Sequence, residues 1–130
     1  MLKRADIIDS PAVKKLLKHN ASRIRFMLQL CVRCGMCAES CFLYTAGDQD
    51  PVYMPSHKML NSVGFVFRKR GRVSIRELET IREIVFHRCV LCMRCYCPLG
   101  VDIPRMIALG RSICRTSGLF RRYDGTDLKP

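Results

Sequence analysis

Eight of the nine cysteines in this 130-residue chain fall in two dense groups. Cysteines this close together are difficult to pair with one another without strain, and thiolates are good ligands for soft metals. The N-terminal stretch has charges and a proline among its short apolar pairs, so we expect no secretory signal and a reducing, cytoplasmic location. The two groups therefore predict metal binding rather than disulfides. Their members are Cys31, Cys34, Cys37 and Cys41, and then Cys89, Cys92, Cys95 and Cys97.

The first group, CVRCGMCAESC, has the spacing of an iron-sulfur ligand run. Its first three thiols recur every three residues, so one tight loop can present three thiolates to a cubane cluster, and Gly35 lets the backbone come close. The fourth thiol, Cys41, follows after a longer gap. In two-cluster proteins the cysteine in that place binds the other cluster, so the spacing predicts a pair of 4Fe-4S clusters.

The second group, CVLCMRCYCP, differs in one respect, because only Tyr96 separates Cys95 from Cys97. Pro98 still follows the last cysteine, as in the bacterial ligand run, which favours Cys97 as the fourth ligand. The ninth cysteine, Cys114, is predicted to be a buried small hydrophobe, with a substitute ligand as the alternative. The predicted ligands are Cys31, Cys34, Cys37 and Cys97 for cluster one, and Cys89, Cys92, Cys95 and Cys41 for cluster two.

Three other kinds of site compete with this prediction. Structural zinc sites usually draw two Cys-x2-Cys pairs from separate loops, whereas three ligands overlap in each run here. A thiol-disulfide redox protein would use single Cys-x2-Cys pairs. The basic run at 67–72 and the net charge of +12 invite a nucleic-acid-binding module, zinc-bound or iron-sulfur. Because the positive charge is spread along the chain, we expect no binding of nucleic acid. We expect instead that the chain docks on an acidic surface of a protein partner.

The elements that must position these loops are predicted to be helices, which gives an all-α fold class. Ser10 before Pro11, the pair Ser74 and Glu77, and Asp102 before Ile103 are helix-start signals. Between them, 23–30 alternates apolar residues with period two, which indicates a strand or an extended entry to the first cysteines. We predict four helices: one that begins near Pro11, one over 56–70, one over 75–87 and one from 103 to about 118.

The chain length predicts one main domain with short extensions. We expect an N-terminal helical arm at 1–23, a two-cluster domain at 24–118 and a C-terminal tail at 119–130. No window reaches the 18 or so uninterrupted apolar residues that a membrane span needs, so no membrane span is predicted.

The phrases CGMCAESCFLYTAGDQDP and CPLGVDIPRMIALGR make 24–118 resemble the C subunit of heterodisulfide reductase, among the α-helical ferredoxins. Among the branches of this family, the sulfur-oxidising heterodisulfide-reductase-like complexes resemble the chain more than the methanogen enzymes do, in their small size and in the phrase FLYTAGDQDP. The resemblance implies an α-helical ferredoxin with two cysteine-rich cluster-binding loops and no catalytic residues. It also implies electron relay between a flavin-containing A subunit and a B subunit that converts disulfides or sulfur compounds. Phe42 departs from the family pattern, where a proline often follows the fourth cysteine.

Arginines lie inside or beside both cysteine loops. Nearby positive charge stabilises the reduced, more negative form of a cluster, so we expect these side chains to raise the reduction potentials. The arginines concerned are Arg33, Arg88 and Arg94.

Overall fold

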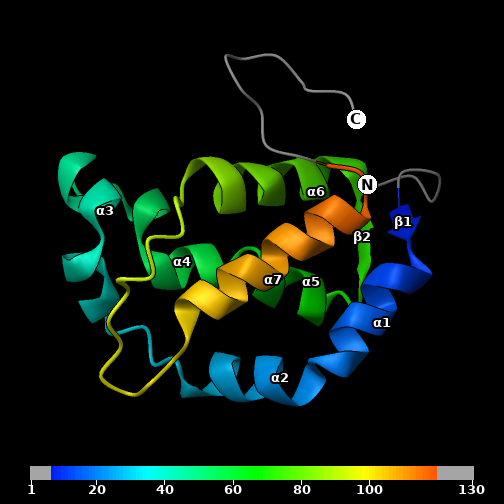
Figure 1. Ribbon diagram of the computed structural model, residues 1–130, viewed down its shortest axis with the longest axis horizontal. Coiled ribbons are helices and arrows are strands. Elements are labelled where there is room, and N and C mark those ends of the chain that lie inside the picture. Colours follow the sequence, from blue (N-terminus) through cyan, green and yellow to red (C-terminus); the bar gives the residue numbers. More distant parts are fainter. Residues whose placement is uncertain (1–6, 120–130) are drawn as a thin grey trace.

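The computed structural model describes residues 7–119, which form a bundle of helices around a long C-terminal helix (Figure 1). The α-helices are α1 Pro11–His19, α2 Ala21–Leu30, α3 Phe42–Ala46, α4 Pro55–Leu60, α5 Val63–Arg68, α6 Ile75–Arg82 and α7 Ile103–Thr116. Shorter elements are the strands β1 Ile7–Asp9 and β2 Arg72–Ser74, the 3₁₀ turns η2 Met36–Ser40 and η3 Pro51–Tyr53, and the π turn η4 Glu83–His87. The all-α class is confirmed, because the two antiparallel strands are only three residues each.

Helix α7 is the centre of the core and contacts α1, α4, α5 and α6. Its inward side chains, which include Met106, Ile107 and Ile113, are at most 1% exposed. Gly110 allows the close approach, because a Cβ there would lie only 2.9 Å from Val85 Cγ1. Burial of this apolar face determines which side of α7 turns toward the core.

The predicted helix starts are confirmed at three places by side-chain caps. Ser10 accepts a hydrogen bond from the backbone N–H three residues ahead at 3.4 Å, and Ser74 does so at 3.1 Å. Asp102 caps α7 in the same way at 3.3 Å. Each cap satisfies a donor that the first turn leaves unpaired.

The prediction of a strand or extended segment over 23–30 is wrong, since this stretch lies in helix α2. Ile24 is fully buried, and Met27 and Leu28 pack partly buried against the core, which is the i, i+3, i+4 face of a helix. Phe26, whose position suggests alternation, is 58% exposed. One solvent-exposed aromatic side chain produces the misleading period of two.

The single helix predicted over 56–70 is also wrong, because α4 and α5 are separate helices. Ser62 Oγ donates to the carbonyl of Lys58 at 2.6 Å, and Asn61 Nδ2 donates to the carbonyl of His57 at 2.8 Å. The Ser62 hydroxyl thus takes the carbonyl of Lys58, while the Ser62 N–H turns to the carbonyl of Met59, so the helix ends at Leu60.

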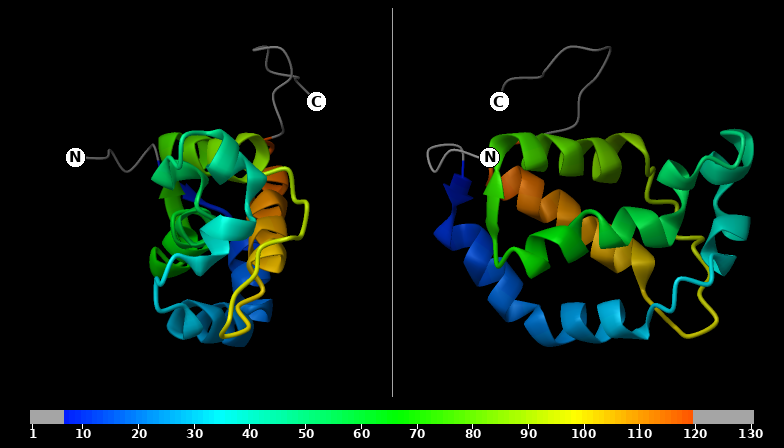
Figure 2. Two further views of the ribbon diagram at one scale, coloured as in Figure 1. Left: turned by 90° about the vertical axis from the view of Figure 1, so that its left-hand side faces the viewer. Right: turned by 180° about the vertical axis from the view of Figure 1, so that it is seen from behind.

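Both cysteine-rich segments lie at one end of the molecule, on the left in Figure 1. Figure 2 shows the chain around 31–41 and the chain around 89–102 side by side when this end faces the viewer. Helix α1 and the β1–β2 pair lie at the opposite end. The division at residues 23 and 118 stays a prediction, and most of the predicted tail lies outside the described residues.

Candidate metal centres

The two cysteine loops repeat the same unusual backbone path. Arg33 and Gly35 have φ of +58° and +79°, and 58 residues further on Leu91 and Met93 have φ of +57° and +66°. Loops of this kind turn backbone N–H groups toward one side, which makes a cradle for an anionic group. In the second loop the N–H of Leu91 donates to Cys89 Sγ at 3.4 Å. The two cysteine groups thus share a backbone path as well as the spacing of their first three cysteines.

The first hollow lies between the first cysteine loop and the chain that follows the second. The other residues that line it include Arg33, Gly35, Ser56 and Ile103. Three of the thiols come from one loop, and the fourth comes from the residue before Pro98. The structure therefore brings together the four residues predicted for cluster one: Cys31, Cys34, Cys37 and Cys97.

The second hollow has the same design with the roles of the loops exchanged. Its other lining residues include Lys58 from α4 and Ile107 from α7. The two hollows are similar in size. The four predicted residues of cluster two line it: Cys89, Cys92, Cys95 and Cys41.

The two hollows are joined by short pieces of chain. Cys95 lines one hollow and Cys97 lines the other. Because these cysteines are two residues apart in the sequence, their Cα atoms lie within about 7 Å of each other. The residue between them, Tyr96, donates its backbone N–H to Ser40 Oγ at 3.0 Å. Ser40 Oγ also lies 3.0 Å from the carbonyl of Cys37, to which it donates. One hydroxyl therefore ties the end of the first motif to the end of the second.

The chemistry of the donors fits cubane clusters. All nine cysteines are free thiols, and each hollow is surrounded by four of them. Among residues 7–119 no three or more His, Cys, Asp or Glu side chains already lie close enough together to hold a single metal ion. Four thiols around one hollow can supply one thiolate to each iron of a 4Fe-4S core.

Burial raises the pKa of two thiols in the metal-free chain. It raises the pKa of Cys95 to about 12, the neighbouring Cys89 adds to the rise, and Lys58 opposes it. A metal that binds here must therefore displace a proton. Burial likewise raises the pKa of Cys114 to about 12. Cys114 is 0% exposed in the core and lines neither hollow, so the structure does not place it with either set of predicted ligands.

Two side chains that sequence reasoning missed hold the second loop. Lys58 Nζ donates to the carbonyl of Arg88 at 2.8 Å and to Cys41 Sγ at 3.7 Å. Arg111 of α7 donates to the carbonyl of Cys89 at 2.7 Å and lies over the ring of Phe86. In the sequence both look like surface cations, and only the fold reveals that they face inward.

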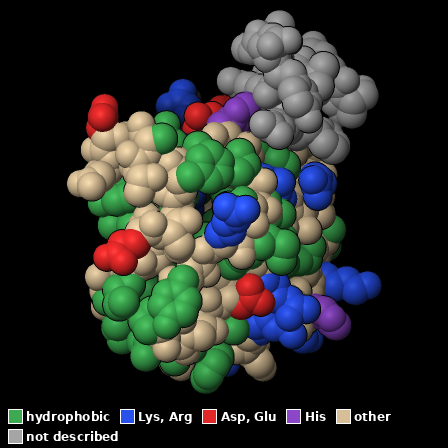
Figure 3. Space-filling model, turned by 60° about the vertical axis from the view of Figure 1, so that its left-hand side comes forward, with side chains coloured by type: hydrophobic (Ala, Val, Ile, Leu, Met, Phe, Trp, Pro, Cys, Tyr) green, Lys and Arg blue, Asp and Glu red, His purple; other side chains and the backbone are tan. Residues whose placement is uncertain are grey.

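The surface around the hollows carries several exposed apolar side chains. Cys34 and Cys92 are themselves exposed. Figure 3 shows hydrophobic side chains on this end, with basic and acidic side chains between them. We call the exposed apolar residues of and beside the two loops the loop rim: Val32, Met36, Phe42, Val90, Met93, Tyr96 and Leu99.

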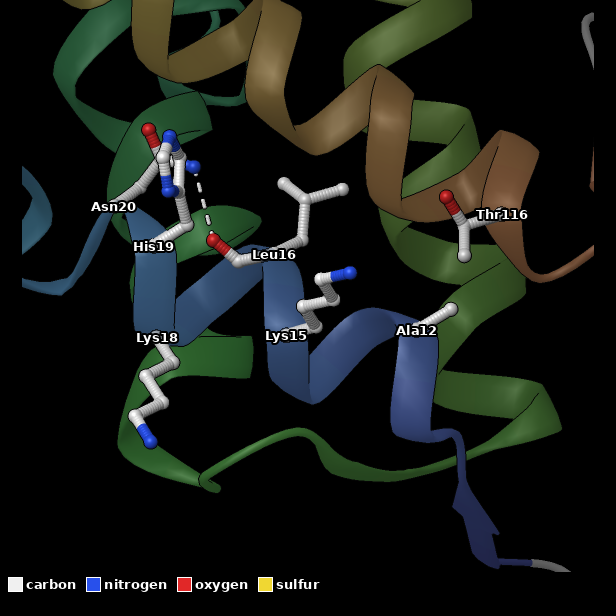
Figure 4. Close-up of a pocket in the computed structure, with 7 residues that line it drawn as sticks. All are labelled: Ala12, Lys15, Leu16, Lys18, His19, Asn20 and Thr116. Carbon is white, nitrogen blue, oxygen red and sulfur yellow. Dashed lines mark hydrogen bonds between the residues drawn. The ribbon is translucent and has the colours of Figure 1, made fainter.

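A larger hollow lies away from the cysteine loops, between α1 and the end of α7 (Figure 4). Lys15, Leu16 and Lys18 line it from α1, and Thr116 of α7 lies across from Leu16. It is open, and none of the described residues that line it is a cysteine. We therefore assign it no part in metal binding.

Comparisons with known proteins agree with this chemistry. The family model described as "4Fe-4S dicluster domain" matches residues 27–101. The "Hdr-like menaquinol oxidoreductase iron-sulfur subunit 2" of Archaeoglobus fulgidus is 32% identical over 126 residues, which cover 86% of this chain and 22% of that protein. The "Hdr-like menaquinol oxidoreductase iron-sulfur subunit" of Archaeoglobus profundus is 30% identical over 131 residues, covering 90% and 23%. The chain thus spans less than a quarter of the length of these relatives.

No solved structure matches the chain. Within residues 7–119, no helix has both the length and the apolar character needed to cross a membrane.

Proposed function

The chain belongs to the family of 4Fe-4S dicluster domains, and from this premise we propose that it holds two such clusters and relays electrons between partner proteins. Each cluster, when bound, takes up and releases one electron. The proposal gives cluster one and cluster two the ligand sets predicted from the sequence. It is supported by the two hollows, each lined by one of those sets: Cys31, Cys34, Cys37 and Cys97, and Cys41, Cys89, Cys92 and Cys95.

The observation that carries the relay function is the exchange of ligands between the loops. Because Cys95 and Cys97 are two residues apart and line different hollows, two clusters held there are neighbours. Electrons can then pass between them without a mobile carrier. No residue of either hollow is needed as a nucleophile or general base, so the proposal assigns catalysis to the partners.

We propose that these partners form a heterodisulfide-reductase-like complex. The two relatives named above carry that description, and the loop rim offers an apolar surface next to both hollows. In the finer form of the proposal, the chain is the C subunit of a sulfur-oxidising complex. It would link a flavin-containing A subunit to a B subunit that converts disulfides or sulfur compounds, in the cytoplasm.

The names of the relatives support a second candidate, in which the electrons come from menaquinol. Anaerobic purification of the tagged chain from its own cells separates the two. Recovery of a flavin subunit together with a disulfide-converting subunit supports the finer proposal, and recovery of a quinol-oxidising membrane subunit supports the second. Recovery of nucleic acid without other subunits would contradict both.

Reduction experiments give an independent answer. The purified chain is mixed with a flavoprotein partner or with a reduced menaquinone analogue, and bleaching of the visible iron-sulfur absorption is followed. Only the true electron source should bleach it rapidly. A chain that contains zinc, or one whose thiols form disulfides on oxidation, would show no such absorption and would refute the proposal.

A further inference from the structure

Lys58 is a buried cation in a place where most proteins avoid one. Only 2% of its surface is exposed, and lysine is almost never fully buried unless its charge is paired. It lies on α4 and forms part of the wall of the second hollow. A charge held in such a place is costly, so a compensating group is expected beside it.

The contacts of Lys58 lead to the thiols. Its Nζ donates to the carbonyl of Arg88 at 2.8 Å, which satisfies one of the three N–H bonds. A second contact, at 3.7 Å, is to Cys41 Sγ. Cys41 and Lys58 both line the second hollow, as do Cys89, Cys92 and Cys95. With thiolates in that hollow, the ammonium group faces negative charge.

The first hollow has no such buried cation among the described residues that line it. Arg33 is the cationic side chain in its wall, and Arg33 is exposed to solvent. Ser56, which is buried there, carries no charge. Water screens an exposed charge strongly, whereas a buried charge acts through a medium of low dielectric constant. The two hollows are therefore alike in thiols and unlike in electrostatics.

We propose that Lys58 is a positioning residue that raises the reduction potential of cluster two above that of cluster one and so directs electrons from the first cluster to the second. This inference rests on the proposed function. Reduction adds one negative charge to a cluster, and the buried ammonium group stabilises the more negative state. In the transfer one electron leaves reduced cluster one and enters oxidised cluster two. No bond forms or breaks, and Lys58 keeps its proton.

The test is a redox titration of the whole chain followed by electron paramagnetic resonance, with iron measured on the same samples. In Lys58→Met the upper of the two midpoint potentials should fall while the lower one stays in place and iron remains at about eight per chain. Arg94→Met is the matched control, since Arg94 is an exposed cation on the second cysteine loop. Its effect should be clearly smaller. Unchanged midpoints in Lys58→Met, or a fall in the lower midpoint alone, would overturn the proposal.

Cys97→Ser assigns the signals, because it removes a predicted ligand of cluster one only. The single midpoint that remains should be the upper one, and adding Lys58→Met should lower it. If Lys58→Met loses iron, Lys58→Gln removes the charge while keeping an N–H donor, and it should again lower the upper midpoint. Loss of iron in both neutral variants would overturn the proposal, since Lys58 would then be required for assembly. A wild-type chain without two clusters would instead refute the proposed function itself.

Discussion

The backbone N–H of Tyr96 donates to the hydroxyl of Ser40 at 3.0 Å, across 56 positions of the sequence. Tyr96 is the one residue between a thiol of the first hollow and a thiol of the second, and Ser40 stands directly before Cys41. This hydrogen bond joins the two points at which the chain passes from one hollow to the other. It compensates for the short gap between the last two cysteines, because it fixes the backbone that both must share.

Removing the Ser40 hydroxyl should loosen both ligand sets. In Ser40→Ala the Tyr96 N–H loses its partner, so we expect both clusters to be lost faster to an iron chelator, by roughly threefold to tenfold for a net loss of about 1 kcal/mol. Ser40→Thr keeps the hydroxyl and is the control. Equal rates of iron release in wild type and Ser40→Ala would show that the bond does not stabilise the loops.

The assignment of Cys97 can be tested against Cys114. Cys97→Ser should reduce the iron content from about eight to about four per chain, because one cluster loses a thiolate. Cys114→Ala should keep all of the iron, since Cys114 lines neither hollow. Iron analysis of anaerobically purified variants measures both. The reverse pattern, with Cys114 required and Cys97 dispensable, would make Cys114 the substitute ligand.

The repeated backbone path predicts that substitutions at two equivalent positions, Gly35 and Met93, change the stability of the fold differently. Gly35 has φ of +79°, and a Cβ added there would have its nearest neighbour 3.9 Å away, so Gly35→Ala should cost about 1 kcal/mol through backbone conformation alone. Met93 adopts φ of +66° with its side chain 72% exposed. Met93→Gly should therefore be neutral or slightly stabilising. Urea unfolding of the iron-loaded variants checks this, and a large loss in Met93→Gly would show that its side chain is needed.

Burial of Cys114 predicts a dependence of stability on pH. In the folded chain the pKa of the Cys114 thiol is about 12, above the ordinary value of 9.0. Between these values the unfolded chain releases a proton that the folded chain keeps, so this contribution to stability is present below pH 9 and is lost as pH rises toward 12. The stability advantage of wild type over Cys114→Ala should shrink between about pH 8 and about pH 10.5. A constant advantage would contradict the burial argument.

Local chemistry explains which elements could be predicted from the sequence. Ser10, Ser74 and Asp102 are caps whose effect is confined to one turn, so the starts of their helices follow from the sequence alone. The errors arise where the pattern of apolar residues reveals neither the buried face nor a side-chain hydrogen bond to the backbone. The alternating pattern places Phe26 on a buried face although it is exposed, and Ser62 breaks a helix through a bond to Lys58 that the pattern does not reveal.

Part of the candidate site could likewise be predicted from the sequence, and part of it could not. Cysteine spacing is a local property, and the two predicted ligand sets each surround one hollow, although their binding of clusters stays a prediction. Lys58 and Arg111 could not be found from spacing, because their partners are backbone carbonyls of Arg88, Val85 and Cys89, some 22 to 30 residues away. No sequence rule makes such a bond visible before the helices are packed.

The central claim, that the chain holds two 4Fe-4S clusters, is tested most directly by iron and acid-labile sulfide analysis of the anaerobically purified chain, with Mössbauer spectroscopy on the same sample. We expect about eight irons and about eight sulfides per chain, all in cubane clusters. About four irons, stoichiometric zinc, or thiols without metal would contradict the account.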